Sequence, residues 1–125
     1  MFRKFVLFVG VLIAAAAILS ACGPAGGGSS GGTPPQTVKI EGTEFAYTPD
    51  AITAKPGQKV TVNLKNSGTV EHTFVIKDLN FKLTAAPGQT VTGTFTAPST
   101  PGTFEFHCDV AGHVESGMTG KLTVQ

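Results

Sequence analysis

The chain has 125 residues, which is enough for one domain, and its formal net charge is +1 with only 14% of its residues charged. This balance excludes a nucleic-acid-binding protein that works through a basic surface, because such binding depends on clustered Lys and Arg, and it excludes a charged disordered tail as the working part of the chain. Hydrophobic residues make up 41% of the chain, which is sufficient for a folded core.

The first 21 residues are typical of a secretory signal. Arg3 and Lys4 come before an uncharged apolar run, residues 5–19, which is shorter than the ~20 residues of a membrane-spanning helix. The run leads into Leu19-Ser20-Ala21-Cys22, which resembles the cleavage box of bacterial lipoproteins. The resemblance implies that Cys22 is lipidated and becomes the new N-terminus, with several acyl chains that attach it firmly to a membrane.

Residues 22–36 predict a flexible tether between that anchor and the rest of the chain. Eleven of the fourteen residues 23–36 are Gly, Pro or Ser, a composition that cannot bury apolar surface. A flexible chain of this length reaches about 20 Å. We therefore expect the remaining residues to work outside the cytoplasm, in an oxidising compartment, on the periplasmic side of a bacterial membrane or at the cell surface.

Residues 37–125 predict a single all-β domain. Apolar side chains occupy every second position, the pattern of half-buried strands, in six runs: 38–40, 60–64, 72–76, 91–95, 104–108 and 118–124. Turn residues separate the runs at 55–58, 66–68, 86–89 and 98–102. Short strands at these spacings favour a β-sandwich or barrel, and only residues 78–85 are ambiguous between helix and strand.

Three potential metal ligands follow one another near the C-terminus in the pattern Cys-x4-His-x4-Met. They are Cys108, His113 and Met118, and they lie between two expected strands. A thiolate and two imidazoles, with a weak axial thioether, are the ligands of a blue copper site, so a second imidazole is needed. Two histidines lie outside this stretch: His107, which directly precedes Cys108 and has the opposite strand parity, and His72, which shares its strand parity with the apolar Phe74. Both His72 and Cys108 are therefore expected to point inward and to converge at one pole of the sandwich.

Residues 37–125 resemble the cupredoxins, the family of plastocyanin, azurin and auracyanin. The matching motifs are Asn-x-Gly-x-x-x-His ending at His72, the Pro-Gly turns, and the Cys-x4-His-x4-Met stretch. The resemblance implies a Greek-key β-sandwich with one mononuclear copper ion, in which His72, Cys108 and His113 are the equatorial ligands and Met118 is the axial ligand. Thr73 stands where many members carry an Asn that helps to lock the Cys strand to the first-His loop, and a threonine can still form a hydrogen bond there.

The resemblance also implies a monomeric one-electron carrier rather than an enzyme. Redox partner proteins are expected to dock near His113, whose ring edge usually reaches the surface in this family, on an apolar patch formed by Val70 and residues 110–114. Four aromatic residues are expected to exclude water from the copper: Phe45, Phe74, Phe104 and Phe106. Residues 37–125 carry seven basic and eight acidic side chains, and this near-neutral charge predicts a modest salt dependence of docking.

Three other functions remain open from the sequence. A copper chaperone or storage lipoprotein would hold transferable copper at an exposed, methionine-rich site, but the chain has only Met1 and Met118. A copper nitrite reductase would use the histidine before the cysteine, His107, for a second copper site, which one histidine per chain completes only at a threefold oligomer axis. We expect His107 to lie on the surface instead, because it faces away from Cys108. The third alternative is a metal-free interaction domain.

Overall fold

The computed structural model describes residues 32–125, which form nine strands and one short 3-10 helix. In chain order they are β1 (Gln36–Thr43), β2 (Ala46–Thr48), β3 (Ala51–Ala54), β4 (Lys59–Asn66), β5 (His72–Ile76), η1 (Lys77–Leu79), β6 (Phe81–Ala85), β7 (Thr90–Thr96), β8 (Gly102–His107) and β9 (Thr119–Val124). The expected signal segment, Cys22 and most of the expected tether lie outside the described residues. Within residues 32–125, no helix has the length and apolar character needed to cross a membrane.

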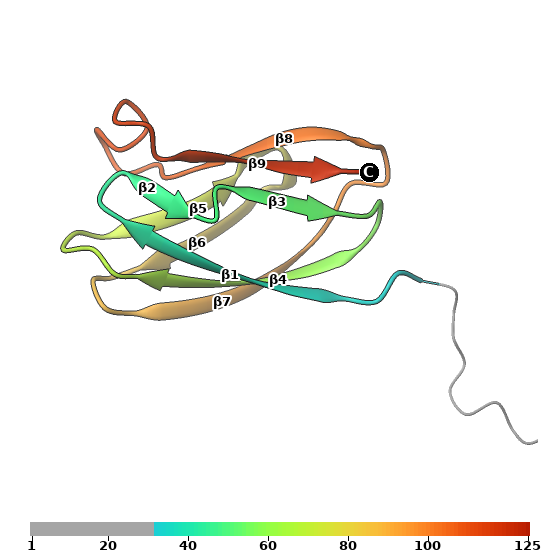
Figure 1. Cartoon of the computed structure of the whole chain (residues 1–125), viewed down its shortest axis with the longest axis horizontal. Coiled ribbons are helices and arrows are strands. Elements are labelled where there is room, and N and C mark those ends of the chain that lie inside the picture. Colours follow the sequence, from blue (N-terminus) through green and yellow to red (C-terminus); the bar gives the residue numbers. More distant parts are fainter. Residues whose placement is uncertain (1–31) are drawn as a thin grey trace, which may run out of the picture.

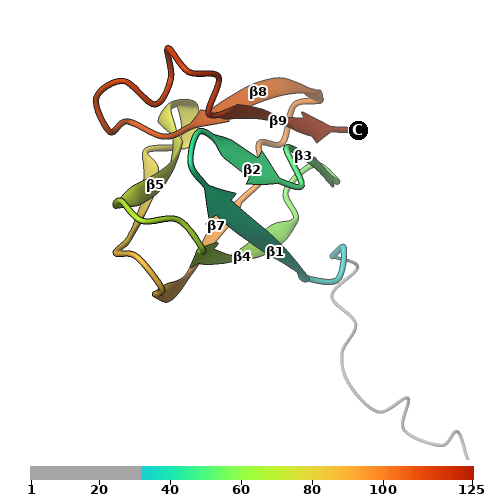
Figure 2. The ribbon, with the colours of Figure 1, turned by 60° about the vertical axis from the view of Figure 1, so that its left-hand side comes forward.

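Two sheets face each other and enclose the core (Figures 1 and 2). One sheet has the strand order β2-β1-β4-β7, and the other has the order β3-β9-β8-β5-β6. β1 pairs with β4 in parallel, as β3 does with β9, whereas the other paired strands are antiparallel. Because the chain crosses repeatedly between the two sheets, the domain is a Greek-key β-sandwich, and the expected all-β class is confirmed.

The six expected strand runs are confirmed as β1, β4, β5, β7, β8 and β9. The ambiguous segment 78–85 contains the end of η1 and then β6, and Asn80 separates the two with a left-handed φ of 51°. β2 and β3 were not expected, because strands of three and four residues are too short to show a clear alternation.

A cluster of aromatic rings fills the core below the site. Phe74 and Phe106 are fully buried, with ring centroids 4.7 Å apart. Tyr47 packs edge-on against both rings, at 5.9 and 5.4 Å, and its hydroxyl donates a hydrogen bond to the backbone carbonyl of Thr73. Phe104 lies at the margin of the core and is only half-buried. Because rings packed in this way restrict each other's rotation, they give β5 and β8 a rigid support.

The two ends of the sandwich are built from different loops (Figure 1). At one end, which we call the site end, lie the loops 44–45, 67–71, 86–89 and 108–118, joined by hydrogen bonds such as Ser67 N to Gly42 O (2.8 Å). At the opposite end, which we call the tether end, lie residues 32–35, 55–58, 97–101 and the C-terminal Gln125. Gln58 Nε2 donates to Pro34 O (2.7 Å) there. The chain therefore enters the domain at the end far from the site end.

Candidate metal centre

Three buried donor side chains meet at the site end. His72 begins β5, Cys108 directly follows β8, and His113 lies in the loop between β8 and β9. Their donor atoms lie within 4.8 Å of one another, and the three residues are 0%, 0% and 6% exposed, respectively. Among residues 32–125, this is the only cluster of three or more His, Cys, Asp or Glu donors. The structure therefore brings together three of the four predicted ligands.

The fourth predicted ligand, Met118, is buried beside this cluster. It is 0% exposed and directly precedes β9. Its Cε and the Cδ2 of His72 lie 3.5 and 3.6 Å from the position that a Cβ on Gly42 would occupy. Met118 and His72 therefore both pack over the backbone of β1 at Gly42, which places the thioether side chain next to the first imidazole.

The imidazole of His72 has the properties of a metal ligand. Its Nδ1 and Nε2 are buried, and neither has a hydrogen-bond partner anywhere in the described chain. Such unpartnered buried groups are rare in folded proteins and call for an explanation such as a bound ion. Burial, and secondarily the neighbouring His113, lowers the pKa of His72, which favours the neutral imidazole that metals bind. Together with a thiolate, a second imidazole and a thioether, this donor set fits copper.

The loop before His72 is held in place by Asn66, the first residue of the Asn-x-Gly motif. The buried Nδ2 of Asn66 donates to the carbonyls of Val70 and Ala85, both at 2.8 Å, and its Oδ1 accepts from Gly68 N at 2.9 Å. A Cβ on Gly68 would lie only 2.7 Å from His72 Nε2. The Asn side chain therefore shapes the loop, and the glycine leaves room for the imidazole.

The loop that carries the other donors is closed by backbone hydrogen bonds. Cys108 N donates to Met118 O at 3.1 Å, and Met118 N donates to His113 O at 3.0 Å. Gly112 and Gly117 adopt positive φ values of 84° and 95°, which other residues rarely tolerate. The spacing Cys-x4-His-x4-Met is therefore the length of a loop that folds back on itself and turns its three donors inward.

Thr73 connects the sulfur of Cys108 to the protein surface. Its backbone N–H donates to Cys108 Sγ at 3.4 Å, while its Oγ1 lies 3.5 Å from Sγ and only 2.7 Å from Asp109 Oδ1. Lys82 of β6 forms an ion pair with Asp109 Oδ2 at 2.7 Å. The hydrogen bond from Lys82, and then the one from Thr73, lowers the pKa of Asp109. Thr73 therefore makes the link between the two ligand-bearing segments, with Asp109 and Lys82 as partners that no pattern in the sequence indicates.

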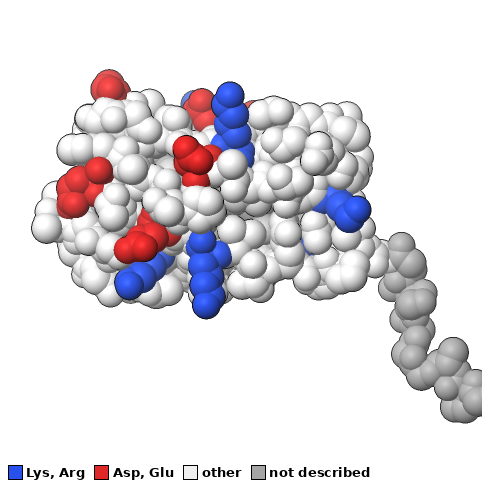
Figure 3. Space-filling model, in the orientation of Figure 1, with Lys and Arg blue, Asp and Glu red and all other residues white. Residues whose placement is uncertain are grey.

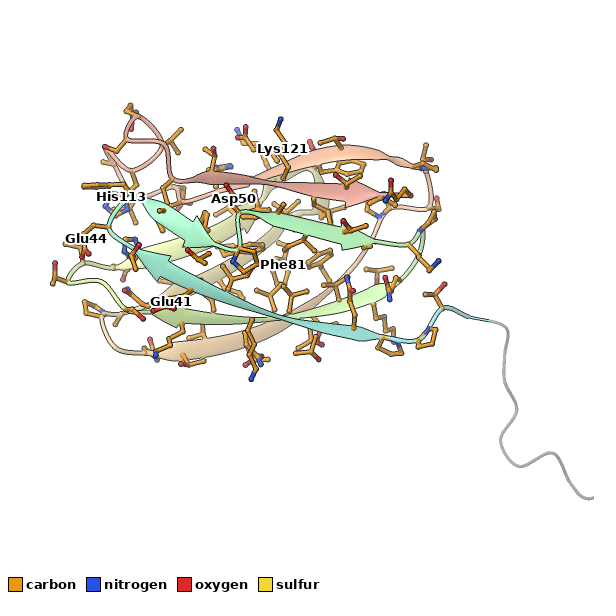
Figure 4. The ribbon with its side chains drawn as sticks, in the orientation of Figure 1. Glu41, Glu44, Asp50, Phe81, His113 and Lys121 are labelled. Carbon is orange, nitrogen blue, oxygen red and sulfur yellow. The ribbon has the colours of Figure 1, made fainter. Side chains whose placement is uncertain are left out.

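Three large hydrophobic side chains are exposed in the described chain, and all lie in the loops of the site end. Phe45, Val70 and Val114 are 43%, 42% and 40% exposed, respectively. The ring of Phe45 stands edge-on against His113, with centroids 5.3 Å apart, at the end where Figure 4 labels His113. Phe45 therefore shields the site as expected, but from the outside, and His113, whose ring edge was expected to reach the surface, is only 6% exposed.

His107 does not belong to the cluster. It lies in β8, its side chain is 18% exposed, and its Nδ1 is 3.8 Å from Glu105 Oε1. Its strand parity places it on the face of the sheet opposite Cys108. The expected direction is therefore correct, although neighbouring residues cover more of the ring than is usual for a surface histidine.

Comparisons with known proteins agree with this geometry. The family described as "Cupredoxin-like domain" matches residues 10–124. Dithionite-reduced auracyanin from the photosynthetic bacterium Roseiflexus castenholzii has 30% sequence identity and a TM-score of 0.65, over 74% of this chain and 99% of its own. Auracyanin A from the green thermophilic photosynthetic bacterium Chloroflexus aurantiacus, described as a "blue" copper protein, has 27% identity and a TM-score of 0.63, over 74% of this chain and 100% of its own. Auracyanin B, at 23% identity and a TM-score of 0.65 over 75% and 91% of the two chains, shares the fold.

Proposed function

The chain belongs to the cupredoxin-like family, and from this premise we propose that it is a blue copper protein that carries single electrons between redox partners. The observation that carries the proposal is the buried cluster of His72, Cys108 and His113 with Met118 beside it. These four side chains would hold one copper ion, which when bound supplies one-electron exchange between Cu(II) and Cu(I). The proposal includes a lipid on Cys22 that tethers the protein outside the cytoplasm, as the N-terminal pattern predicts.

The protein's own residues keep this site rigid and dry. An electron carrier works fastest when its ligands barely move between oxidation states. The hydrogen bonds of Asn66 hold the loop before His72, and the Thr73–Asp109 pair ties that loop to Cys108. The N–H of Thr73 points at Cys108 Sγ and therefore helps to hold the sulfur in the position from which it would bind the metal.

Electron exchange is proposed to take place at the site end. There the exposed Phe45, Val70 and Val114 form a small apolar surface, and His113 lies directly behind the ring of Phe45. Weak redox encounters typically use small interfaces of this kind. A redox partner seated on this surface would lie close to the one ligand that is not fully buried.

The burial of the donors favours a carrier over a copper chaperone. A protein that hands copper to a partner must expose its ligands to ligand exchange, whereas His72, Cys108 and Met118 are all 0% exposed. The same donor set disfavours an enzyme, because four protein ligands leave no open position for a substrate.

Addition of one equivalent of Cu(II) tests the proposal. An intense visible thiolate-to-copper band should appear, should bleach reversibly with a mild reductant, and should be absent from Cys108→Ser. His107→Ala is the matched control, because it removes an imidazole outside the cluster and should keep the band. Bound copper without colour, or copper lost on reduction, would favour the chaperone, and failure to bind copper would refute the ligand assignment.

A further inference from the structure

The charged side chains are arranged along the long axis of the domain rather than scattered. The loops of the site end contain four acidic residues, Glu44, Glu71, Asp109 and Glu115, and no Lys or Arg. At the tether end, Lys55 lies in the loop 55–58 and Lys59 begins β4, and the loops there contain no acidic residue. The near-neutral net charge therefore hides a separation of charge between the two ends.

Opposite charges offset one another along the sides of the sandwich. Glu41 neighbours Lys65 in the register of β1 and β4, and Glu105 faces Lys121 in the register of β8 and β9. Figure 3 shows acidic side chains at the site end, acidic and basic side chains next to one another toward the middle of this face, and a basic side chain at the far end. The charges that no neighbouring opposite charge offsets are therefore concentrated at the site end and the tether end.

Three of the four acidic residues at the site end form no ion pair within the described chain. Asp109 is paired with Lys82, but Glu44, Glu71 and Glu115 are exposed and contact no lysine. Glu44 accepts hydrogen bonds from the backbone N–H and the hydroxyl of Thr69, which stabilise its charged form. These three carboxylates come from the same loops as the exposed apolar residues: Phe45 follows Glu44, Val70 precedes Glu71, and Val114 precedes Glu115.

We propose that the site end is a docking surface for a redox protein whose own cofactor edge is surrounded by basic residues. The inference rests on the proposed electron-carrier function and specifies its partner. The apolar surface formed by Phe45, Val70 and Val114 makes the close contact. The three unpaired carboxylates around it, which we call the acidic rim, attract the partner and steer the encounter. A second copy of this chain does not fit, because it would bring like charges together. In the exchange, one electron would pass from the reduced cofactor of the partner to the copper-loaded site, so that the partner is oxidised as the site is reduced, and no covalent bond forms or breaks.

The test compares a basic cytochrome c with the same cytochrome after maleylation of its lysines, which inverts its charge. With the copper-loaded protein, the second-order rate constant for the native cytochrome should exceed that for the maleylated form at least tenfold at 10 mM salt. It should fall about tenfold as the salt rises to 300 mM, because salt screens the attraction. This differs from the modest salt dependence that the net charge alone predicts.

Glu71→Gln/Glu115→Gln should slow the reaction with native cytochrome c by about three- to tenfold at low salt. Asp78→Asn/Glu105→Gln removes the same charge from η1 and β8 and should change the rate less than twofold. Two results would overturn the proposal while leaving electron transfer intact. One is a rate constant that changes neither with salt nor on substitution of Glu71 and Glu115. The other is a faster reaction with the maleylated cytochrome than with the native one.

Binding to the copper-free protein separates this inference from the proposed function. Amide chemical shifts of the labelled copper-free protein should change on addition of native cytochrome c mainly in the loops 44–45, 67–71 and 108–118, and much less in the rim variant. Shifts at these loops without electron transfer in the loaded protein would support the surface and contradict the carrier. Shifts spread over the β-sheet faces would overturn the docking proposal.

Discussion

A single hydroxyl hydrogen, that of Thr73, has two possible acceptors near the metal centre. Asp109 Oδ1 lies 2.7 Å from Thr73 Oγ1, and Cys108 Sγ lies 3.5 Å from it. Because the carboxylate is charged and closer, it takes the hydrogen, and the sulfur receives only the backbone N–H of Thr73. Hydrogen bonds to a ligating sulfur influence the redox potential of a metal. Asp109 therefore controls the environment of Cys108 without touching the metal.

Asp109→Ala is expected to raise the reduction potential of the copper-loaded protein by about 20–60 mV. The freed hydroxyl can donate to Cys108 Sγ, and one hydrogen bond contributes about 0.5–1.5 kcal/mol, where ~59 mV corresponds to a factor of ten for a one-electron couple. The loss of a negative charge acts in the same direction. Cyclic voltammetry measures the shift, and the thiolate-to-copper band should move with it.

The double variant Asp109→Ala/Thr73→Val separates these two contributions. It lacks the hydroxyl, so it should keep only the part of the increase that comes from the lost charge. A potential that is unchanged or lower in Asp109→Ala would show that the Thr73 hydroxyl does not respond to Asp109. Equal potentials in the single and double variants would assign the whole effect to charge.

At the scale of elements, the strands were predictable wherever one face is buried over several residues. β4 alternates in this way along its whole length, because its inward positions Val60, Val62 and Leu64 are 0% exposed. The ligands were predictable for a related reason, since three of them belong to one local loop. Asp109 and Lys82 could not be paired from the sequence, because they are 27 positions apart and meet only through the packing of β5 against its neighbours.

β9 contains a glycine whose role is visible only in three dimensions. A Cβ on Gly120 would lie 2.2 Å from Phe106 Cζ and 2.5 Å from the backbone oxygen of Asp50. Neither atom can move freely, because Phe106 is buried in the aromatic cluster and Asp50 O accepts the hydrogen bond of Lys121 N at 2.8 Å. Gly120 therefore permits the close contact between β9 and the core ring.

Gly120→Ala is expected to destabilise the fold by about 1–3 kcal/mol, the usual cost of forcing an extra group into a packed core. For a domain of this size, this corresponds to a fall in Tm of roughly 4–20 °C, which thermal unfolding followed by circular dichroism measures. Gly102→Ala in β8 is the matched control, because its Cβ would meet Phe104 at 3.6 Å, an ordinary contact. Equal melting temperatures for the two variants would contradict this account of β9.

At the scale of the whole molecule, the site end and residues 32–35, where the described chain begins, lie at opposite ends of the sandwich. β1 runs from the tether end to Gly42, next to His72 and Met118, and its eight residues span about 26 Å at the rise of a strand. If Cys22 anchors the chain as proposed, the proposed docking surface lies at the end of the domain opposite to residues 32–35, through which the chain enters it. We propose that the tether predicted from the composition of residues 22–36 would then leave this surface accessible to partners beside the membrane.

Bound copper is expected to stabilise the whole domain and not only the site end. The four donors come from β5 and from the segment between β8 and β9, so one ion joins two segments that are distant in the sequence. A ligand that binds only the folded state at 100–1,000 times its Kd adds about 2.7–4.1 kcal/mol, which raises the Tm of a small domain by at least ~10 °C. Calorimetry of the protein with and without one equivalent of copper measures this difference.

Cys108→Ser distinguishes this linkage from a non-specific effect of copper. The variant keeps both histidines and Met118 but lacks the thiolate, so copper should raise its Tm by only a few degrees. An equal increase in the variant and in the unaltered protein would place the stabilising copper elsewhere on the chain. An increase confined to the unaltered protein would mean that the metal links Cys108, which follows β8, to His72 at the start of β5, where one of the two buried, unpartnered ring nitrogens would bind the ion.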